Sequence, residues 1–289
     1  MTKNSSTYQT QTVEAVKAPA QSSQTADKTH LFFLHFPPER EPAPLLIYFP
    51  GLDETGKELI SLEMDAFSQD CDVCGLVIPS EDLDDWDKLA AAAIGLVRDE
   101  IAKRPANTPV YLCAESFGGC LGIRVLEQAP DLFDRVVLVN PASSFHRVPW
   151  LASGSLLLSL VPAFVFDQPS DWLVFFLAPL HRISDKAYRA LAESTRAAPK
   201  ETLLRRLALM RAFSIQTEKL RQVRYPVLLV GSAGDRILPS VEETQRLAQI
   251  FPNAQAVTLP YSGHACLVED DVNLEELISA HHFMPRLDT

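Results

Sequence analysis

Three residues with the chemistry of a covalent catalyst each follow a separate apolar run of the 289-residue sequence. They lie in Tyr111-Leu-Cys-Ala-Glu-Ser-Phe-Gly-Gly119, Leu229-Val-Gly-Ser-Ala-Gly-Asp-Arg-Ile-Leu-Pro239 and Pro260-Tyr-Ser-Gly-His-Ala-Cys266. A hydroxyl becomes a strong nucleophile when an imidazole takes its proton and a carboxylate holds the imidazole in place. Brought together, Ser116 would attack an ester carbonyl, with His264 as base and Asp235 as the orienting acid.

The residues around Ser116 fit the nucleophile elbow G-x-S-x-G, with Ala114 at the first small position and Gly118 at the last. Small residues are needed there because the serine occupies a sharp turn between a strand and a helix. A cap of the following helix is the alternative interpretation of this serine. The chain order serine, acid, histidine is that of α/β-hydrolases, and it favours a catalytic triad over three unrelated residues.

The acid of this triad has a rival position. Asn140 directly follows the apolar run 135–139, where some relatives carry aspartate, but an amide cannot hold the negative charge. Glu242 and Glu243 fall inside the next predicted helix and point less directly at the histidine. We therefore expect Asp235 to be the acid.

The negative charge that develops on the substrate oxygen needs pre-oriented N–H donors. The first expected donor is the backbone N–H of Phe117, at the start of the helix that follows the nucleophile. The second is the N–H of Leu52, in Tyr48-Phe-Pro-Gly-Leu-Asp-Glu-Thr-Gly56, where Gly51 permits a turn. An ordinary Pro-Gly turn is the alternative for this loop.

No metal and no other cofactor is expected. Cys71 and Cys74 have the spacing of half a zinc site or a redox pair, but no second pair follows at ligand spacing. Cys74 enters an apolar run, so burial is the favoured interpretation. The odd number of cysteines, five, without a secretory signal predicts reduced thiols and a cytoplasmic location.

The elements that must position these residues alternate between strand-like and helix-like runs. Strands are expected at 31–36, 45–49, 75–79, 110–113, 135–139, 226–230 and 254–259, and helices at 59–68, 86–103, 117–128, 241–251 and 272–282. Such alternation with wholly apolar strands predicts an α/β fold, in which a mostly parallel sheet carries helices on both faces. We expect one α/β-hydrolase domain over residues 29–289.

A long segment at about 146–215 interrupts the alternation and exceeds the length of a connecting loop. Residues 148–166 carry no charge, and residues 172–180 are again apolar. A transmembrane helix is one interpretation of this composition. Prolines and a glycine interrupt the first run, and the following strand must rejoin the same sheet. A helical lid inserted over the ligand-binding edge is therefore favoured.

Residues 1–28 are rich in Ser, Thr, Gln and Ala and contain no apolar signal segment. They predict a disordered tail, because they offer too little apolar area to offset the entropy lost on ordering. A transit peptide is the alternative, and it is disfavoured because the tail has three lysines and no arginine.

The charge of the chain excludes one class of partner and indicates another. A formal net charge of −11 excludes general nucleic-acid binding. Between His181 and Tyr225, however, eleven Lys and Arg face four Asp and Glu, so this segment carries about +7. Beside the uncharged run, it indicates peripheral contact with an anionic membrane. Solvated arginines on a lid packed against the core are the equally weighted alternative.

Several linked motifs extend the pattern beyond the triad. They are Phe49-Pro-Gly-Leu-Asp-Glu-Thr-Gly56, Ala114-Glu-Ser-Phe-Gly-Gly-Cys-Leu121, Val139-Asn-Pro-Ala-Ser-Ser-Phe145, Leu238-Pro-Ser240 and Ser262-Gly-His-Ala-Cys-Leu-Val-Glu-Asp270. Along roughly residues 44–283, the chain resembles the hydrolase portion of plastid phytyl ester synthases, in the esterase/lipase/thioesterase family of plants and cyanobacteria. The resemblance implies acyl transfer to phytol or diacylglycerol from lipid-derived or thioester donors, with membrane-associated substrates.

The chain departs from this family in three places. Glu54 stands where a second glycine is usual in the oxyanion loop, and Ala114 begins the elbow. The plant proteins also carry an acyltransferase-like half with an H-x-x-x-x-D motif, and none of the seven histidines here has aspartate five positions later. We therefore expect hydrolysis of, or transfer from, apolar lipid or phytyl-type esters by the serine domain alone. The alternatives are a small-ester or thioester hydrolase, and a catalytically silent hydrolase fold that binds an apolar ligand.

Overall fold

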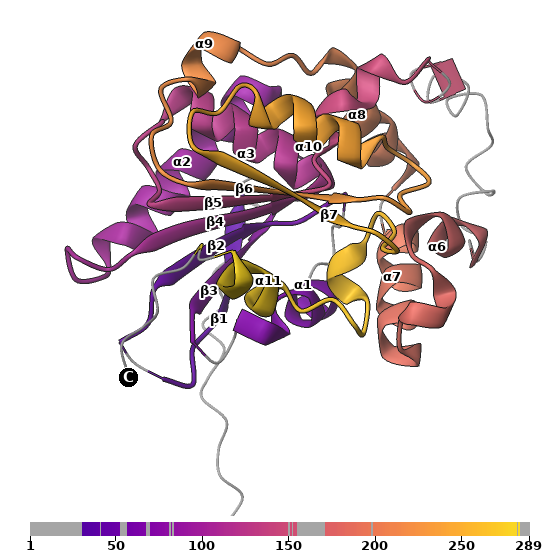
Figure 1. Ribbon diagram of the computed structural model, residues 1–289, viewed down its shortest axis with the longest axis horizontal. Coiled ribbons are helices and arrows are strands. Elements are labelled where there is room, and N and C mark those ends of the chain that lie inside the picture. Colours follow the sequence, from indigo (N-terminus) through magenta and orange to yellow (C-terminus); the bar gives the residue numbers. More distant parts are fainter. Residues whose placement is uncertain are drawn as a thin grey trace, which may run out of the picture.

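A seven-stranded sheet forms the centre of the protein, with the strand order β1-β3-β2-β4-β5-β6-β7 (Figure 1). This computed structural model describes residues 31–40, 42–52, 57–67, 70–80, 82, 84–149, 151, 153–154, 171–197, 199–281 and 283. The strands are β1 (Phe32–Phe36), β2 (Leu45–Phe49), β3 (Asp72–Val77), β4 (Val110–Glu115), β5 (Arg135–Val139), β6 (Val227–Ser232) and β7 (Ala254–Leu259).

Neighbouring strands are parallel throughout the sheet except at one edge, where β1 pairs antiparallel with β3. Every residue of β2, β4 and β6 is buried. Strands covered on both faces need apolar side chains in both directions, which is why these segments are almost continuous apolar runs in the sequence. The carboxyl ends of the parallel strands meet at one edge of the sheet.

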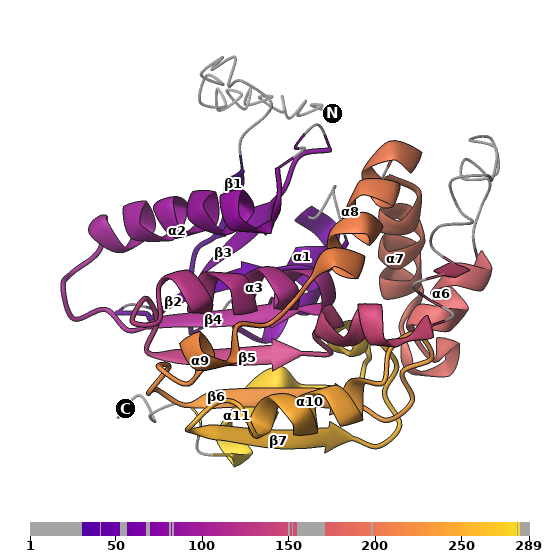
Figure 2. The same ribbon diagram turned by 90° about the horizontal axis from the view of Figure 1, so that it is seen from above.

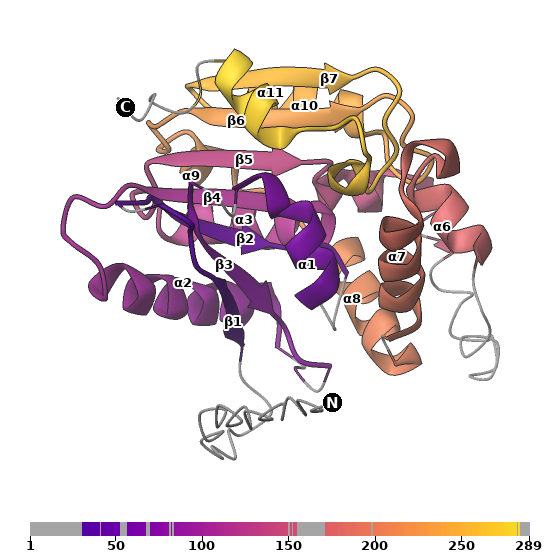
Figure 3. The ribbon, with the colours of Figure 1, turned by 90° about the horizontal axis from the view of Figure 1, so that it is seen from below.

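Helices cover both faces of the sheet (Figures 1 and 3). One face carries α2 (Trp86–Ala102), α3 (Ser116–Gln128) and α10 (Ser240–Ala248), and the other carries α1 (Lys57–Glu63) and α11 (Leu274–Ala280). Successive residues of β4 point to opposite faces of the sheet. Leu112 lies in the core beneath α2 and α3, and Cys113 lies in the core beneath α1 and α11. The expected α/β architecture, a mostly parallel sheet with helices on both faces, is confirmed.

The segment at about 146–215, expected to form a lid, contains several short helices. After η2 (Ala142–Arg147) come α6 (Asp171–Leu177), η4 (Leu180–Arg182), α7 (Asp185–Ala197) and α8 (Lys200–Ala212), followed by α9 (Thr217–Leu220). Figure 2 shows α6, α7 and α8 beyond the carboxyl ends of the strands. The indole N–H of Trp86 in α2 donates to the carbonyl of Leu209 in α8 at 2.8 Å, which ties α8 to the body of the protein.

Two predictions fall partly or wholly outside the described residues. The tail at 1–28 lies outside them, and so do residues 155–166, which make up most of the uncharged run at 148–166. Within the described part of the chain, no helix combines the length and the apolar character that crossing a bilayer requires.

Candidate active site

Ser116 occupies a strained turn between β4 and α3. It is the first residue of α3 and directly follows the last residue of β4. Its φ of 51° lies in the left-handed region, which residues other than glycine rarely adopt. Gly118 permits this turn, because a Cβ there would lie 2.1 Å from the carbonyl oxygen of Phe49 at the end of β2. The backbone of the elbow therefore has the shape that its sequence predicted.

Ala114, which departs from the elbow pattern, packs against a glycine in α3. A Cβ at Gly122, two turns into α3, would lie 3.1 Å from the Cβ of Ala114. Because Gly122 has no side chain, the helix packs over the Ala114 methyl without displacement. Alanine at the first small position is thus compatible with the tight strand–helix approach that an elbow needs.

Ser116, His264 and Asp235, which the sequence predicted to meet, lie in one hydrogen-bonded row. The Nε2 atom of His264 lies 2.8 Å from the Ser116 hydroxyl, and its Nδ1 atom lies 2.7 Å from the Oδ2 atom of Asp235. Ser116 directly follows β4, and Asp235 and His264 lie in the loops that follow β6 and β7, so all three gather at the carboxyl edge of the sheet. The side chains of His264 and Asp235 are 8% and 1% exposed, so the pair is shielded from solvent.

Asp235 is held by donors other than the imidazole. The N–H groups of Ile237 and Leu238 donate to its Oδ1 atom at 2.8 and 3.0 Å, and the Ser240 hydroxyl donates to Oδ2. Burial alone would raise the pKa of Asp235, but the charge of His264 and these hydrogen bonds outweigh burial and lower it. The carboxylate is therefore ionised at neutral pH and fixed in position.

His264 is buried, and burial alone would lower the pKa of its imidazole. The charge and hydrogen bond of Asp235, with a further contribution from the charge of Glu115, outweigh burial and raise this pKa above its ordinary value. The site thus favours the protonated imidazole, which is the form that exists after a base has taken a proton from a serine.

Asn140, at the rival acid position, holds the histidine loop through its amide. Its Nδ2 atom donates to the carbonyl of His264 at 2.7 Å, and its Oδ1 atom accepts from the N–H of Ser232 at 2.8 Å. Its φ of 42° is left-handed, a conformation that asparagine tolerates better than most residues. A carboxylate could not donate to the loop, so this position needs the amide.

The loop expected to supply the second oxyanion donor lies against the nucleophile. A Cβ at Gly51 would lie 3.7 Å from the Cβ of Ser116. The buried guanidinium of Arg206 in α8 donates to the carbonyl of Leu52 at 3.0 Å and to that of Ile78 at 2.7 Å, which fixes the backbone at Leu52. Phe117 follows Ser116 at the start of α3. The N–H groups of Leu52 and Phe117 remain the predicted oxyanion donors.

A buried group of acids behind Ser116 was not predicted. The Tyr48 hydroxyl lies 2.7 Å from the Oε2 atom of Glu63 and 3.0 Å from that of Glu115. A charged residue at position 115, inside an apolar strand and beside the nucleophile, was a signal that the sequence offered. Glu63 gave no such signal, because a glutamate on a short helix is normally solvated.

Cys71 and Cys74, which have the spacing of a zinc half-site, do not face one another. Cys71 belongs to the core beneath α1 and α11, whereas Cys74 belongs to the core beneath α2 and α3. All five cysteines are free and buried. The favoured interpretation of this pair, burial, is confirmed.

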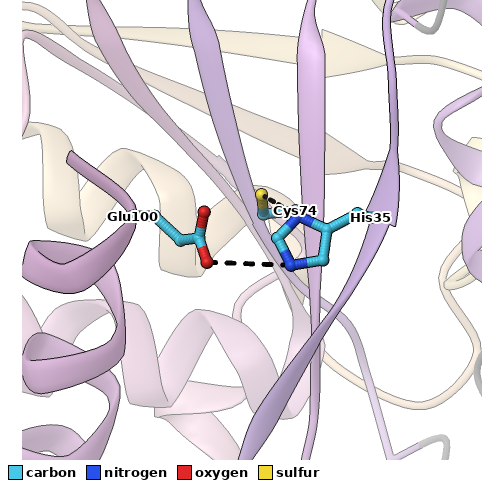
Figure 4. A group of neighbouring side chains, drawn as sticks. All are labelled: His35, Cys74 and Glu100. Carbon is cyan, nitrogen blue, oxygen red and sulfur yellow. Dashed lines mark hydrogen bonds and ion pairs between the residues drawn. The ribbon is translucent and has the colours of Figure 1, made fainter. Parts of the chain in front are cut away.

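Cys74 instead approaches His35 and Glu100, from β1 and α2 (Figure 4). The Nδ1 atom of His35 lies 3.4 Å from Sγ of Cys74, and its Nε2 atom lies 3.7 Å from Oε1 of Glu100. Glu100 is already paired with Lys103 at 2.7 Å and Arg104 at 2.9 Å. These two cations neutralise the charge that would attract a metal ion, so we assign no metal to this cluster.

Comparisons with known proteins assign the chain to a family. The chain matches the family model described as serine aminopeptidase, S33, over residues 80–271, which include Ser116, Asp235 and His264. It is 31% identical to phytyl ester synthase 1, chloroplastic, of Arabidopsis thaliana, over 82% of this chain and 37% of that protein. It is 28% identical to phytyl ester synthase 2 of the same plant, over 84% and 38% respectively. The chain therefore spans little more than a third of the length of these two relatives.

Solved structures share the fold at low sequence identity. An esterase from Rhodococcus sp. ECU1013 superposes with a TM-score of 0.68 at 17% identity, covering 87% of this chain and 93% of that one. At this level of identity, the likeness concerns the fold alone.

Proposed function

Since this chain is an α/β-hydrolase that belongs to the family described as serine aminopeptidase, S33, we propose that it is a serine ester hydrolase or acyltransferase that acts on apolar esters through an acyl-enzyme. The observation that supports this most strongly is the unbroken row of hydrogen bonds from Ser116 through His264 to Asp235. If Ser116 were only a helix cap and His264 only a surface residue, nothing would bring their side chains into one row of hydrogen bonds at a strained turn.

In the first half-reaction, the Nδ1–H of His264 donates to Asp235, so the lone pair of Nε2 faces the Ser116 hydroxyl. Oγ bonds to the ester carbonyl carbon while its proton moves to Nε2. The carbonyl oxygen becomes an oxyanion and accepts hydrogen bonds from the N–H groups of Leu52 and Phe117. When the tetrahedral intermediate collapses, the alcohol leaves with the proton from Nε2, and Ser116 keeps the acyl group.

In the second half-reaction, water or a lipid alcohol attacks the acyl-enzyme. His264 takes a proton from the attacking hydroxyl and returns it to Oγ of Ser116 as the acyl bond to the serine breaks. Water gives hydrolysis, and an alcohol gives acyl transfer. One site can perform both reactions, and the acceptor that reaches it decides the product.

Two observations support an apolar substrate. Two of the relatives are named for phytyl ester synthesis. In addition, α6 with η4 presents large apolar side chains beyond the carboxyl edge of the sheet: Phe175, Phe176 and Leu180 are 46%, 40% and 45% exposed. We propose that this surface belongs to a lid and that it contacts an anionic membrane from which the ester is drawn.

Turnover of defined esters tests the proposal. Purified protein and its Ser116→Ala variant would be offered lipid esters, a phytyl ester, a short-chain ester and an acyl thioester, with and without added phytol, and products would be identified by mass. We expect turnover of long-chain esters that the variant loses by at least about 10³-fold. Turnover restricted to short esters or thioesters would contradict the apolar substrate, and equal products from both proteins would contradict the serine mechanism.

A further inference from the structure

A second set of buried ionisable side chains lies directly behind the nucleophile. Tyr48 of β2, Glu63 of α1 and Glu115 of β4 are 0%, 6% and 3% exposed. The Tyr48 hydroxyl contacts both carboxyl groups, at 2.7 and 3.0 Å, although a phenol has one proton to donate. Two ionised carboxylates that both lie within 3.0 Å of one buried hydroxyl would repel one another. One of the two carboxyl groups must therefore hold a proton.

The position of this group relates it to the proposed acyl transfer, on which the following inference rests. Glu115 is the last residue of β4 and is bonded to Ser116, and α1, which carries Glu63, packs against η5 (Cys266–Val268) just after His264. We propose that Glu63 and Glu115 share one proton, and that the negative charge Glu115 carries when it is ionised stabilises the protonated imidazole of His264. Glu115 is thereby a positioning residue that acts through His264.

The ionisable groups that interact electrostatically with Glu115 come from β2, α1, β4 and the segments that follow β6 and β7: Tyr48, Glu63, Cys113, Asp235, His264 and Cys266. Burial raises the pKa of the phenol and of the two thiols well above their ordinary values, so these three are neutral. The charges that matter near Glu115 are therefore those of Glu63, Asp235 and His264.

The electrostatics of the two partners agree with this assignment. Burial raises the pKa of Glu115 to about 7, against the opposing effects of the His264 charge and of the hydrogen bonds from Tyr48 and Glu63. Glu115 is in turn one of the groups that raise the pKa of His264. Glu115 therefore exchanges its proton in the range of pH where His264 must act as a base, and when Glu115 is ionised its charge acts on the imidazole that must accept the serine proton.

Substitutions of the two carboxyls should move the acid limb of the rate profile in opposite directions. The limb of kcat/KM at low pH reports protonation of the free base, here His264. Glu115→Gln removes a negative charge that raises the pKa of His264, so the acid limb of this variant should shift to lower pH. Glu63→Gln removes a carboxylate whose negative charge opposes ionisation of Glu115, and its amide can still donate a hydrogen bond to the Glu115 carboxylate. Glu115 should therefore ionise more readily, and the acid limb of this variant should shift to higher pH. We expect each shift to be at least about half a pH unit.

The experiment measures kcat/KM against pH for the wild type, Glu115→Gln and Glu63→Gln with a serine-dependent ester substrate. The pKa of the His264 imidazole is measured in parallel by NMR, with its signal assigned from a His264→Gln spectrum. Glu127→Gln is the matched control: it removes a buried carboxylate that pairs with Arg124 on α3, eleven residues from Ser116 along the same helix. We expect the Glu127→Gln profile to keep the wild-type limb.

Opposite shifts of the two variants, seen in the imidazole titration, would support the proton-sharing pair. Loss of rate without any shift of the limb or of the imidazole pKa would overturn it, because a packing role lowers activity but does not move the titration. If the wild type turns over no ester, the proposed function fails, but the NMR titration still decides whether Glu115 acts on His264. If a variant does not fold, the other carboxyl variant carries the test with its own predicted direction.

Discussion

His264 is restrained at three points, two on its imidazole and one on its backbone, and each restraint comes from a different segment of the chain. Asp235 holds Nδ1, the Ser116 hydroxyl faces Nε2, and the amide of Asn140 holds the backbone carbonyl. The first two contacts were predictable from residue types and chain order. The third was not, because the sequence marked Asn140 only as a position where the acid is missing. Its amide is required because it donates and accepts at the same time.

Asn140→Asp should therefore destabilise the protein. The aspartate keeps the size and the tolerance for positive φ, but it turns donors into acceptors facing the carbonyl of His264 and the Ser232 hydroxyl. A buried polar group left without its partner costs about 1–3 kcal/mol, and more when it is charged. Urea unfolding at pH 7 measures the loss in unfolding free energy.

The matched control for this change is Asn273→Asp. Asn273 is exposed and caps α11 by accepting from the N–H of Glu276 at 3.1 Å, a role that aspartate fills equally well. We expect its unfolding free energy to stay within about 0.5 kcal/mol of wild type. Equal stability of both variants would show that the Asn140 amide does not hold the histidine loop.

At the scale of elements, the nucleophile elbow depends on how closely three backbones approach one another. The end of β2, the turn at Ser116 and the first turn of α3 meet where Gly118 leaves room. This arrangement was predictable because a small residue two positions after the serine has one main structural use. The support of the oxyanion loop was not predictable, since Arg206 reaches it from α8, far along the chain.

Gly118→Ala should disrupt the elbow. Its methyl would lie 2.1 Å from the Phe49 carbonyl and 2.3 Å from that of Pro50, so the strand and the helix must separate. We expect a loss of unfolding free energy of about 1–3 kcal/mol and loss of ester turnover. Gly95→Ala is the control, because nothing lies within 4 Å of a Cβ at that exposed position of α2. It should stabilise the helix by up to about 1 kcal/mol, and similar effects of both changes would contradict the close approach.

Element boundaries show where local pattern was insufficient. The third strand was predicted at 75–79, but β3 begins at Asp72 and ends before Pro79. The charged residue Asp72 does not fit the apolar pattern of a buried strand, so the beginning of β3 was missed. Its side chain is accommodated by pairing with Arg104, a residue distant in sequence. The fourth strand was predicted to end at Cys113, and it continues to Glu115. Burial of that glutamate depends on Tyr48 and Glu63, which no spacing within the strand reveals.

At the scale of the whole molecule, at least one arginine of the basic segment is buried against the body of the protein and is neither solvated nor available to a membrane. Arg206 is buried and binds backbone carbonyls, and Arg205 approaches the carbonyl of Asp84 at 3.4 Å. These arginines fasten α8 to the body of the protein. The membrane-facing surface that we propose therefore rests mainly on α6 and η4, where Arg236 stacks on Phe175 with its guanidinium carbon 4.2 Å from the ring centroid.

Flotation with anionic liposomes tests this surface. We expect salt-sensitive binding of the wild type that a Phe175→Ser/Phe176→Ser variant weakens several-fold, because two partly exposed aromatic side chains no longer enter the bilayer interface. Phe32→Ser is the matched control: Phe32 is as exposed as Phe175, at 46%, but lies on the edge strand β1. Equal flotation of the two variants, or no flotation of the wild type, would contradict membrane contact through α6.

The central claim is that the Ser116 hydroxyl is a nucleophile activated by His264. Labelling with a long-chain fluorophosphonate, followed by peptide mass spectrometry, measures this directly. We predict a single adduct on the peptide that contains Ser116, lost in Ser116→Ala and slowed by at least about 10²-fold in His264→Ala. A folded wild-type protein that takes up no label, or that carries it on another residue, would contradict the account.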